Sequence, residues 1–162
     1  MTRNEPPGAA LYDADFYSWT QTEAAALRAL PPGGPTAHLD IAHLAEEIAD
    51  LGKRDLREVT SYLVLVVQHL IKLDAVSASR DAAHWHAEAA NFQGAARRTF
   101  SPGLRRLLDI DDIWTSGCRA AGRFLRDRGA GNPPPTCPFT LDDLLAPDFD
   151  VETLVARVAL RR

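Results

Sequence analysis

The sequence has only two cysteines among its 162 residues, Cys118 and Cys137. Two thiols cannot build a disulfide framework or a four-thiolate zinc site, so we expect both to be free. No stretch approaches the roughly 18 to 20 uninterrupted apolar residues that a membrane-spanning helix needs, and residues 1–8 lack the apolar core of a signal peptide. We therefore expect a soluble, cytoplasmic protein with no membrane partner.

A strong charge of one sign is also lacking, because 18 Lys and Arg oppose 22 Asp and Glu for a net charge of −4. Such a balance does not attract polyanions over the whole chain, so general nucleic-acid binding is not favoured. Lys53 and Lys72 are the only lysines, and the remaining basic residues are arginines in an alanine-rich background. This composition is typical of a coding bias, which makes the number of arginines weak evidence for an anion site.

The composition favours one globular domain, with 46% hydrophobic and 25% charged residues. The sequence shows no repeat and no alternating run that requires a sheet, and prolines and glycines divide it into helical blocks. It predicts an all-α fold, a compact multi-helix bundle with a short helical N-terminal segment. We expect a flexible N-terminus over residues 1–10, a single helical domain over 11–149, and a tail over 150–162 that either forms a further helix or frays.

The clearest helical signal lies at about residues 54–74. Apolar residues recur there at intervals of three and four, which places them along one side of a helix. They are Leu56, Val59, Leu63, Val66, Leu70 and Leu73. Because this helix is apolar nearly all round, we expect it to be the central helix, covered by others on several sides.

An amphipathic helix is predicted to begin after Asp40, a good N-cap residue. Its apolar residues fall in one stripe that we expect to face the core: Ile41, Leu44, Ala45, Ile48 and Leu51. Gly52 either ends or kinks this helix, because glycine costs about 1 kcal/mol relative to alanine inside a helix. Upstream, Thr20 and Glu23 have the spacing of a capping box and predict a helix from Thr20 to about Leu30.

Three further helical blocks are predicted in the second half of the chain. Ser79 or Asp81 caps the first, Asp109 lies at a break before the main part of the second, and Thr140 caps the third. Prolines and glycines separate the blocks, as expected of residues that interrupt helices.

The richest polar cluster lies on the amphipathic helix. At 100° per residue, His43, Glu47 and Asp50 share a face roughly opposite the apolar stripe, with Glu46 beside them. Carboxylates and imidazoles at such spacing are typical of divalent-metal sites in helical bundles, which take more ligands from a second helix. His69, at the edge of the central seam, is the candidate partner. Glu47 and His69, with Glu46 or Asp50, are therefore a hypothetical metal or acid–base site.

The alternative interpretation of this cluster is structural. The acidic face is then solvated, and His69 is a hydrogen-bonded histidine at a helix interface with Glu47 as its partner. The zinc-protease motif H-E-x-x-H is absent, and no glycine-rich phosphate loop precedes a strand. A divalent metal is thus the one cofactor for which the sequence offers candidate ligands.

Arg119, Arg123 and Arg126 are spaced by four and three residues and share one helix face. Such a row can contact phosphates or an acidic partner. It can equally form a solvated face or pair with the acidic helix. The N-terminal aromatic block also has two interpretations, since it forms either a recognition surface or a cover for the core. Its residues are Tyr12, Phe16, Tyr17 and Trp19.

Five short strings in order resemble a known family. They are Leu11-Tyr12-x-x-Asp15-Phe16-Tyr17-x-Trp19-Thr20, Leu39-Asp40-x-x-His43-Leu44-Ala45-Glu46-Glu47-Ile48-x-x-Leu51-Gly52, His69-Leu70-Ile71-Lys72, Ser101-Pro102-x-Leu104-Arg105 and Cys137-Pro138-Phe139-Thr140-Leu141. Over roughly residues 11–149, the chain resembles the bacterial domain-of-unknown-function family number 29. The resemblance implies an α-helical bacterial domain of this length with no established activity, cofactor or partner. His43 stands where the family more often has asparagine, and Leu73 where it has tryptophan.

Two functions follow from these observations. No complete catalytic set is evident, which favours a non-enzymatic protein-interaction or self-association module whose partner is another protein or a second copy of the chain. The alternative is a metal-dependent or acid–base enzyme that uses Glu47 and His69. The enzyme requires these two side chains to lie within about 3 to 5 Å of each other in an open pocket.

Overall fold

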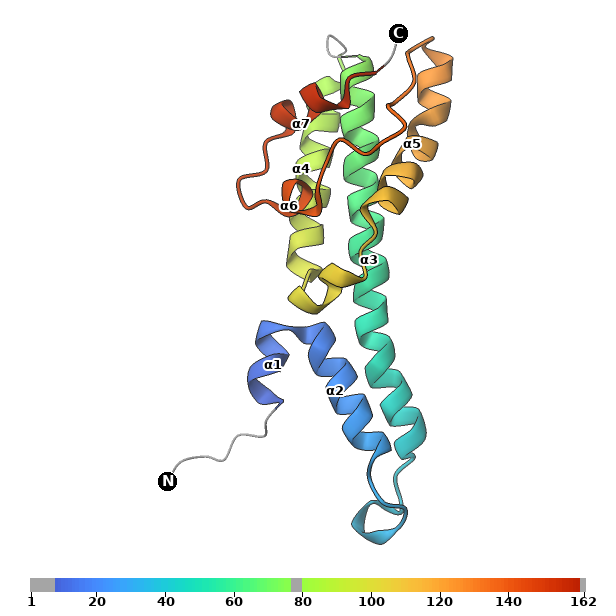
Figure 1. The fold of residues 1–162 in the computed structure, drawn as a ribbon, viewed down its shortest axis with the longest axis vertical. Helices are drawn as coiled ribbons and strands as arrows, with labels where there is room; N and C mark the ends of the chain where they lie inside the picture. The colour runs from blue at the N-terminus through green and yellow to red at the C-terminus, as the bar shows by residue number, and fades with distance from the viewer. Residues whose placement is uncertain (1–7, 77–79, 161–162) are drawn as a thin grey trace. The chain divides into compact units, whose positions relative to one another are not determined.

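The computed structural model describes residues 8–76 and 80–160. Most of the predicted flexible N-terminus and the predicted cap Ser79 lie outside the described residues. Every regular element of the described chain is a helix (Figure 1). The predicted all-α fold class is therefore confirmed. The chain divides into two compact units, which are described in turn.

The first unit consists of the residues up to Arg57 together with Phe100–Leu107. Its helices are α1 (Ala9–Ala14), α2 (Phe16–Arg28), the 3₁₀ helix η1 (Gly34–Thr36), the first part of α3 and the 3₁₀ helix η2 (Pro102–Arg106). Helix α2 runs beside this part of α3 (Figure 1), and the Gln21 amide donates across to the carbonyl of Ala49 at 3.2 Å. The two helices and their connection form a hairpin.

Helix α2 has its N-cap five residues earlier than predicted. The Asp15 carboxylate caps it by accepting hydrogen bonds from the backbone N–H of Ser18 at 3.2 Å and from the Ser18 hydroxyl at 2.7 Å. Thr20 lies inside the helix, fully buried, and its hydroxyl donates to the Tyr17 carbonyl at 2.7 Å. The predicted cap at Thr20 is wrong because Asp15 already satisfies the start of the helix.

Helix α3 is one continuous helix of 35 residues, Ile41–Ala75. It begins after Asp40 as predicted, and the Asp40 carboxylate accepts a hydrogen bond from the backbone N–H of His43 at 3.2 Å. Gly52 does not end this helix; it lies within it and is buried. A Cβ at this position would stand 2.9 Å from the ring of Tyr17, so the glycine allows α2 to approach closely.

The second unit consists of residues 58–99 and 108–162. Around the remainder of α3 it places α4 (Ala82–Thr99), α5 (Ile110–Asp127), α6 (Leu141–Leu145) and α7 (Val151–Val158) (Figure 1). The predicted break at Asp109 is confirmed, because this residue is the N-cap of α5. The predicted cap at Thr140 is also confirmed; it forms a capping box with Asp143 at the start of α6.

The apolar part of α3 is the centre of the second unit. The predicted seam is buried from Val59 to Leu73, and Val67 and Ile71 beside it are fully buried as well. Helix α5 comes close at Gly117, where a Cβ would stand 2.8 Å from the side chain of Val67. The predicted central apolar helix is confirmed, but it begins at Ile41 and not near residue 54.

Candidate interaction surface

The two residues of the hypothetical metal or acid–base pair lie on the same helix. Glu47 and His69 are 22 positions apart on α3, which corresponds to about 33 Å at a rise of 1.5 Å per residue. Side chains at this separation cannot share one site. The hypothesis required two separate helices that could pack side by side, and the continuation of the helix through Gly52 removes that arrangement.

The acidic face of α3 is open to solvent in the first unit. Glu46 and Glu47 are exposed. Asp50 accepts a hydrogen bond from the Lys53 ammonium at 2.7 Å, and this bond is the main cause that lowers the pKa of Asp50. The face is therefore a solvated surface with an ion pair between neighbouring turns, which contributes little to stability.

His69 is buried in the second unit. Its Nδ1 donates a hydrogen bond to the carbonyl of Leu65 at 2.7 Å, because a carbonyl oxygen can only accept, and its ring lies 5.6 Å from that of Phe92 on α4. Burial lowers the pKa of His69, so the imidazole is neutral at neutral pH. The surroundings of His69 are those of a hydrogen-bonded histidine at a helix interface.

The part of the chain that the structure describes has neither a metal-binding group of side chains nor an activated thiol. No group of three or more His, Cys, Asp and Glu side chains there is arranged to hold a metal ion. Cys118 and Cys137 are free thiols, and burial raises the pKa of Cys118 to about 11 and also raises that of Cys137. Both thiols are protonated near neutral pH, a state of low nucleophilicity.

The three arginines of the predicted anion face are exposed on α5. The guanidinium of Arg123 lies 3.7 Å from the carboxylate of Asp127, one turn further along. An exposed pair at this distance is weak. The anion face formed by Arg119, Arg123 and Arg126 stays a prediction.

No helix among the described residues is long and apolar enough to span a membrane.

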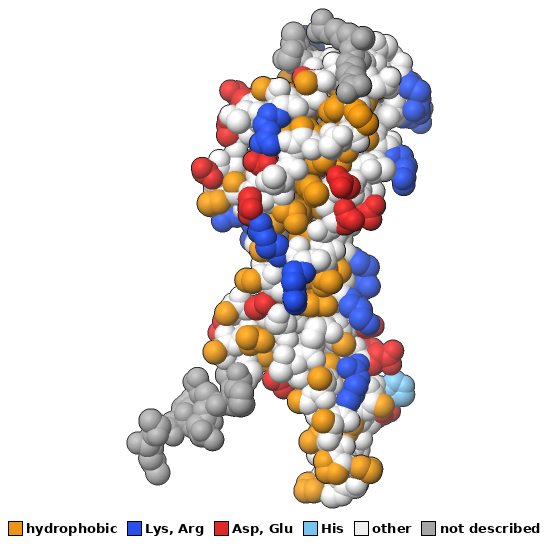
Figure 2. Space-filling model, in the orientation of Figure 1, with side chains coloured by type: hydrophobic (Ala, Val, Ile, Leu, Met, Phe, Trp, Pro, Cys, Tyr) orange, Lys and Arg blue, Asp and Glu red, His pale blue; other side chains and the backbone are white. Residues whose placement is uncertain are grey.

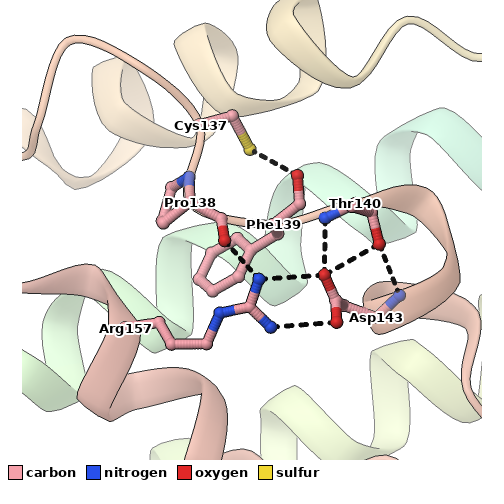
Figure 3. Close-up of polar contacts among 6 residues, drawn as sticks. All are labelled: Cys137, Pro138, Phe139, Thr140, Asp143 and Arg157. Atoms are coloured by element: carbon pink, nitrogen blue, oxygen red, sulfur yellow. Dashed lines mark hydrogen bonds and ion pairs between the residues drawn. The ribbon is translucent and has the colours of Figure 1, made fainter.

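A polar cluster that the sequence did not indicate joins α6 to α7 (Figure 3). The Arg157 guanidinium donates to both carboxylate oxygens of Asp143 at 2.9 and 3.0 Å and to the carbonyl of Pro138. The same carboxylate accepts from the backbone N–H and the hydroxyl of Thr140 at 2.7 and 2.8 Å. The Arg157 hydrogen bonds are the main cause that holds the pKa of Asp143 well below its ordinary value of 3.8. The cluster anchors α7 to the loop before α6.

An apolar hollow of about 430 Å³ lies in the second unit between α3, α4 and α7. Apolar residues such as Leu73 and Val155 line it, and its polar side chains are those of His86 and Glu152. Active sites normally combine an apolar pocket with several convergent polar groups. The polar lining of this hollow is too sparse to define a catalytic site.

Large apolar side chains are exposed only in the first unit, as far as the structure describes the chain. They are Tyr12, Leu30, Leu39, Leu44 and Leu107, with exposed fractions between 43% and 51%. Leu30 follows α2, Leu39 precedes α3 and Leu44 lies in the first turn of α3. These three leucines form the hairpin tip, and Figure 2 shows hydrophobic side chains gathered at this end of the hairpin.

The first unit also buries little apolar mass of its own. Its buried apolar residues within the described ranges are Ala24, Ala45, Ala49 and Leu104. Three of the four are alanines, which remove much less apolar area from water than leucine does. Leu27 and Ile48 pack against the alanines but are only partly buried.

The structure corrects the predicted core face of α3 in this unit. Ala45, Ala49 and Gly52 are buried on the side of α3 that faces α2, whereas Leu44 is 44% exposed. Small side chains allow the two helix backbones to approach, and Leu44 lies outside this contact. Ile41, Leu44, Ile48 and Leu51 form an apolar stripe beside this contact, the α3 stripe, in which Ile48 packs partly against the alanines, Leu44 is exposed, and Ile41 and Leu51 are half-buried.

These observations define an all-helical protein with an exposed apolar surface on a two-helix hairpin. The chain belongs to the family described as "Domain of unknown function DUF29", whose model matches residues 11–150. It is also similar to an α-helical protein of unknown function from Rhodospirillum rubrum whose crystal structure is known. The two are 29% identical with a TM-score of 0.80, over 91% of this chain and 96% of that one. A comparison with curated proteins finds no match.

Proposed function

We propose that the protein is a non-enzymatic interaction module whose hairpin of α2 and α3 binds protein through the hairpin tip and the α3 stripe. One observation carries the proposal: within the described residues, every exposed large apolar side chain belongs to the first unit. Apolar groups that are exposed together mark interaction surfaces, because covering them with a partner removes them from water. In the second unit, by contrast, every large apolar side chain among the described residues is buried or partly buried.

The small core of the hairpin supports the same proposal. Short helices gain most of their stability from packing an amphipathic face, and small domains that cannot build a core are commonly stabilised by association. The hairpin packs α2 on alanines and leaves Leu44 without a comparable cover. A protein partner that packs on this face stabilises the hairpin and explains why apolar side chains stand on its surface.

The hypothesis of a metal-dependent or acid–base enzyme is not supported, because Glu47 and His69 are far apart along α3. The partner is either another protein or a second copy of the chain. A cytoplasmic location stays a prediction of the sequence.

Photo-crosslinking in cells that produce the protein tests the proposal. A photoreactive amino acid replaces Leu44 in one variant and His84, an exposed residue of α4, in the control. Both variants carry the photoreactive group on the surface of a helix. We expect irradiation to produce a covalent protein adduct from position 44, identified by mass spectrometry, and no comparable adduct from position 84. An equal yield at the two positions, or no adduct at position 44, contradicts the proposal.

A further inference from the structure

We propose that the α3 stripe is covered by the α3 stripe of a second copy of this chain, in an antiparallel pair related by a two-fold axis. This inference rests on the proposed function and names its partner. An interface between identical copies must be complementary to itself, because each surface meets its own equivalent. The α3 stripe meets this requirement in its apolar spacing, and Asp40 and Arg54 at its margin match in charge as well.

The apolar spacing of the stripe is the same in both directions along the helix. Its residues Ile41, Leu44, Ile48 and Leu51 are separated by three, four and three positions. When two such helices pair in opposite directions, Ile41 lies opposite Leu51 of the second copy, and Leu44 lies opposite Ile48. The two-fold axis then passes close to position 46, and all four apolar residues of each copy are paired with apolar residues.

Charges at one margin of the stripe favour the antiparallel direction. Asp40, Glu47 and Arg54 are separated by seven residues each and therefore follow the same margin. In the antiparallel pair, Asp40 lies near Arg54 of the second copy, and the two-fold axis creates this pair twice. In a parallel pair, the same margin faces Ala45 and Gly52, which carry no charge and are buried on the side of α2.

Glu47 gives the arrangement a distinctive signature. It lies at the same margin next to the two-fold axis, so it approaches Glu47 of the second copy, and the two carboxylates repel each other. Glu46 precedes it by 100° around the helix and faces away from the stripe. Both side chains are exposed in the single chain. Removal of the charge at residue 47 therefore strengthens the pair, whereas removal at residue 46 does not.

Sedimentation velocity of the purified full chain over a wide range of concentration tests the inference. We expect the mass to rise from 17.7 kDa toward twice that value with increasing concentration. Leu44→Asp should remain monomeric, and Leu107→Asp, which changes a leucine of similar exposure outside the stripe, should associate like the wild type. Circular dichroism verifies that both variants retain the helical fold. At low salt, Glu47→Gln should bind itself about three- to tenfold more tightly, and Glu46→Gln should match the wild type.

Any result other than these overturns the inference. A mass of 17.7 kDa at every concentration excludes the pair; if position 44 still crosslinks to a different protein in cells, the proposed function stands and only self-pairing is wrong. A dimer that Leu44→Asp leaves intact uses another surface. A dimer that Glu47→Gln weakens or leaves unchanged does not have the antiparallel register.

Discussion

Gly52 of α3 lies directly against Thr20 of α2. A Cβ on residue 52 would meet the Thr20 hydroxyl, and it would stand 2.9 Å from the ring of Tyr17. This close approach determines which face of α3 is covered in the first unit. Because α2 packs on the small residues, the leucine at position 44 points elsewhere and is exposed.

Gly52→Ala should lower the free energy of unfolding by up to about 2 kcal/mol, because forcing the added methyl group into a packed contact costs about 1 to 3 kcal/mol. The higher helix propensity of alanine, worth about 1 kcal/mol, offsets only part of this cost. Gly94→Ala on α4 is the control, since the nearest atom to its Cβ is the flexible Arg98 guanidinium at 3.4 Å. Urea denaturation measures both, and a gain in stability at both positions would contradict the close approach of α2 and α3.

Asp143→Asn should lower the free energy of unfolding at pH 7 by about 1 to 3 kcal/mol, because it weakens the charged hydrogen bonds to Arg157. The pKa of Asp143 is lowered in the fold, mainly by Arg157, so its contribution is complete above its ordinary pKa of 3.8 and is lost as the pH falls below that value. The difference between wild type and variant should therefore shrink below about pH 4.

Asp127→Asn is the control for this effect, because Asp127 forms only an exposed pair with Arg123 at 3.7 Å. We expect little change in its stability at any pH. Urea denaturation at several pH values measures both variants. A difference between wild type and Asp143→Asn that stays constant from pH 7 to pH 3 would show that the Asp143 carboxylate is not the stabilising group.

His69 should make the second unit less stable as the pH falls from 7 to 5. Burial lowers the pKa of the folded imidazole, with a further lowering effect from Lys72 and an opposing effect from Glu88, so the unfolded chain takes up a proton at higher pH than the folded one. Each unit of such a shift corresponds to about 1.4 kcal/mol. His69→Gln should lose less stability over this range than the wild type. Identical slopes for wild type and His69→Gln would contradict the buried, neutral imidazole.

Cys118 should react slowly with thiol reagents in the folded protein. Its pKa is raised to about 11 by burial, so on the order of one thiol in a thousand is ionised at pH 8. In a Cys137→Ala background, we expect the reaction with a disulfide reagent at pH 8 to be about a hundredfold slower in buffer than in urea. Equal rates in the two solvents would show that Cys118 is open to solvent.

The sequence predicted the central helix of the second unit because local spacing is sufficient there. The residues from Val59 to Leu73 recur at helical intervals, and no other secondary structure places them on one side. The caps at Asp40 and Thr140 were predictable for the same reason, since each depends on a side chain and a backbone N–H within three residues.

The candidate surface was not predictable, because it depends on which of two apolar faces α2 covers. Leu44 and Ala45 both belong to the predicted stripe, and only the packing of α2 on Ala45 and Gly52 reveals that Leu44 is exposed. The continuity of α3 was hidden by Gly52, since an isolated glycine marks either a helix end or a close approach. Because Gly52 could be read as a helix end, Glu47 and His69 were assigned to two helices and paired.

Distance measurements between spin labels test the antiparallel pair most directly. Glu46 and Lys53 are exposed on the same face of α3, seven residues apart, and each is replaced by a labelled cysteine in a background without Cys118 and Cys137. Antiparallel pairing predicts that the two labels of a dimer lie level with each other at position 46. At position 53 they are offset by about 21 Å along the helix axes, which gives a clearly longer distance. Equal distances at the two positions, or no dipolar coupling between copies at either, would contradict the pair.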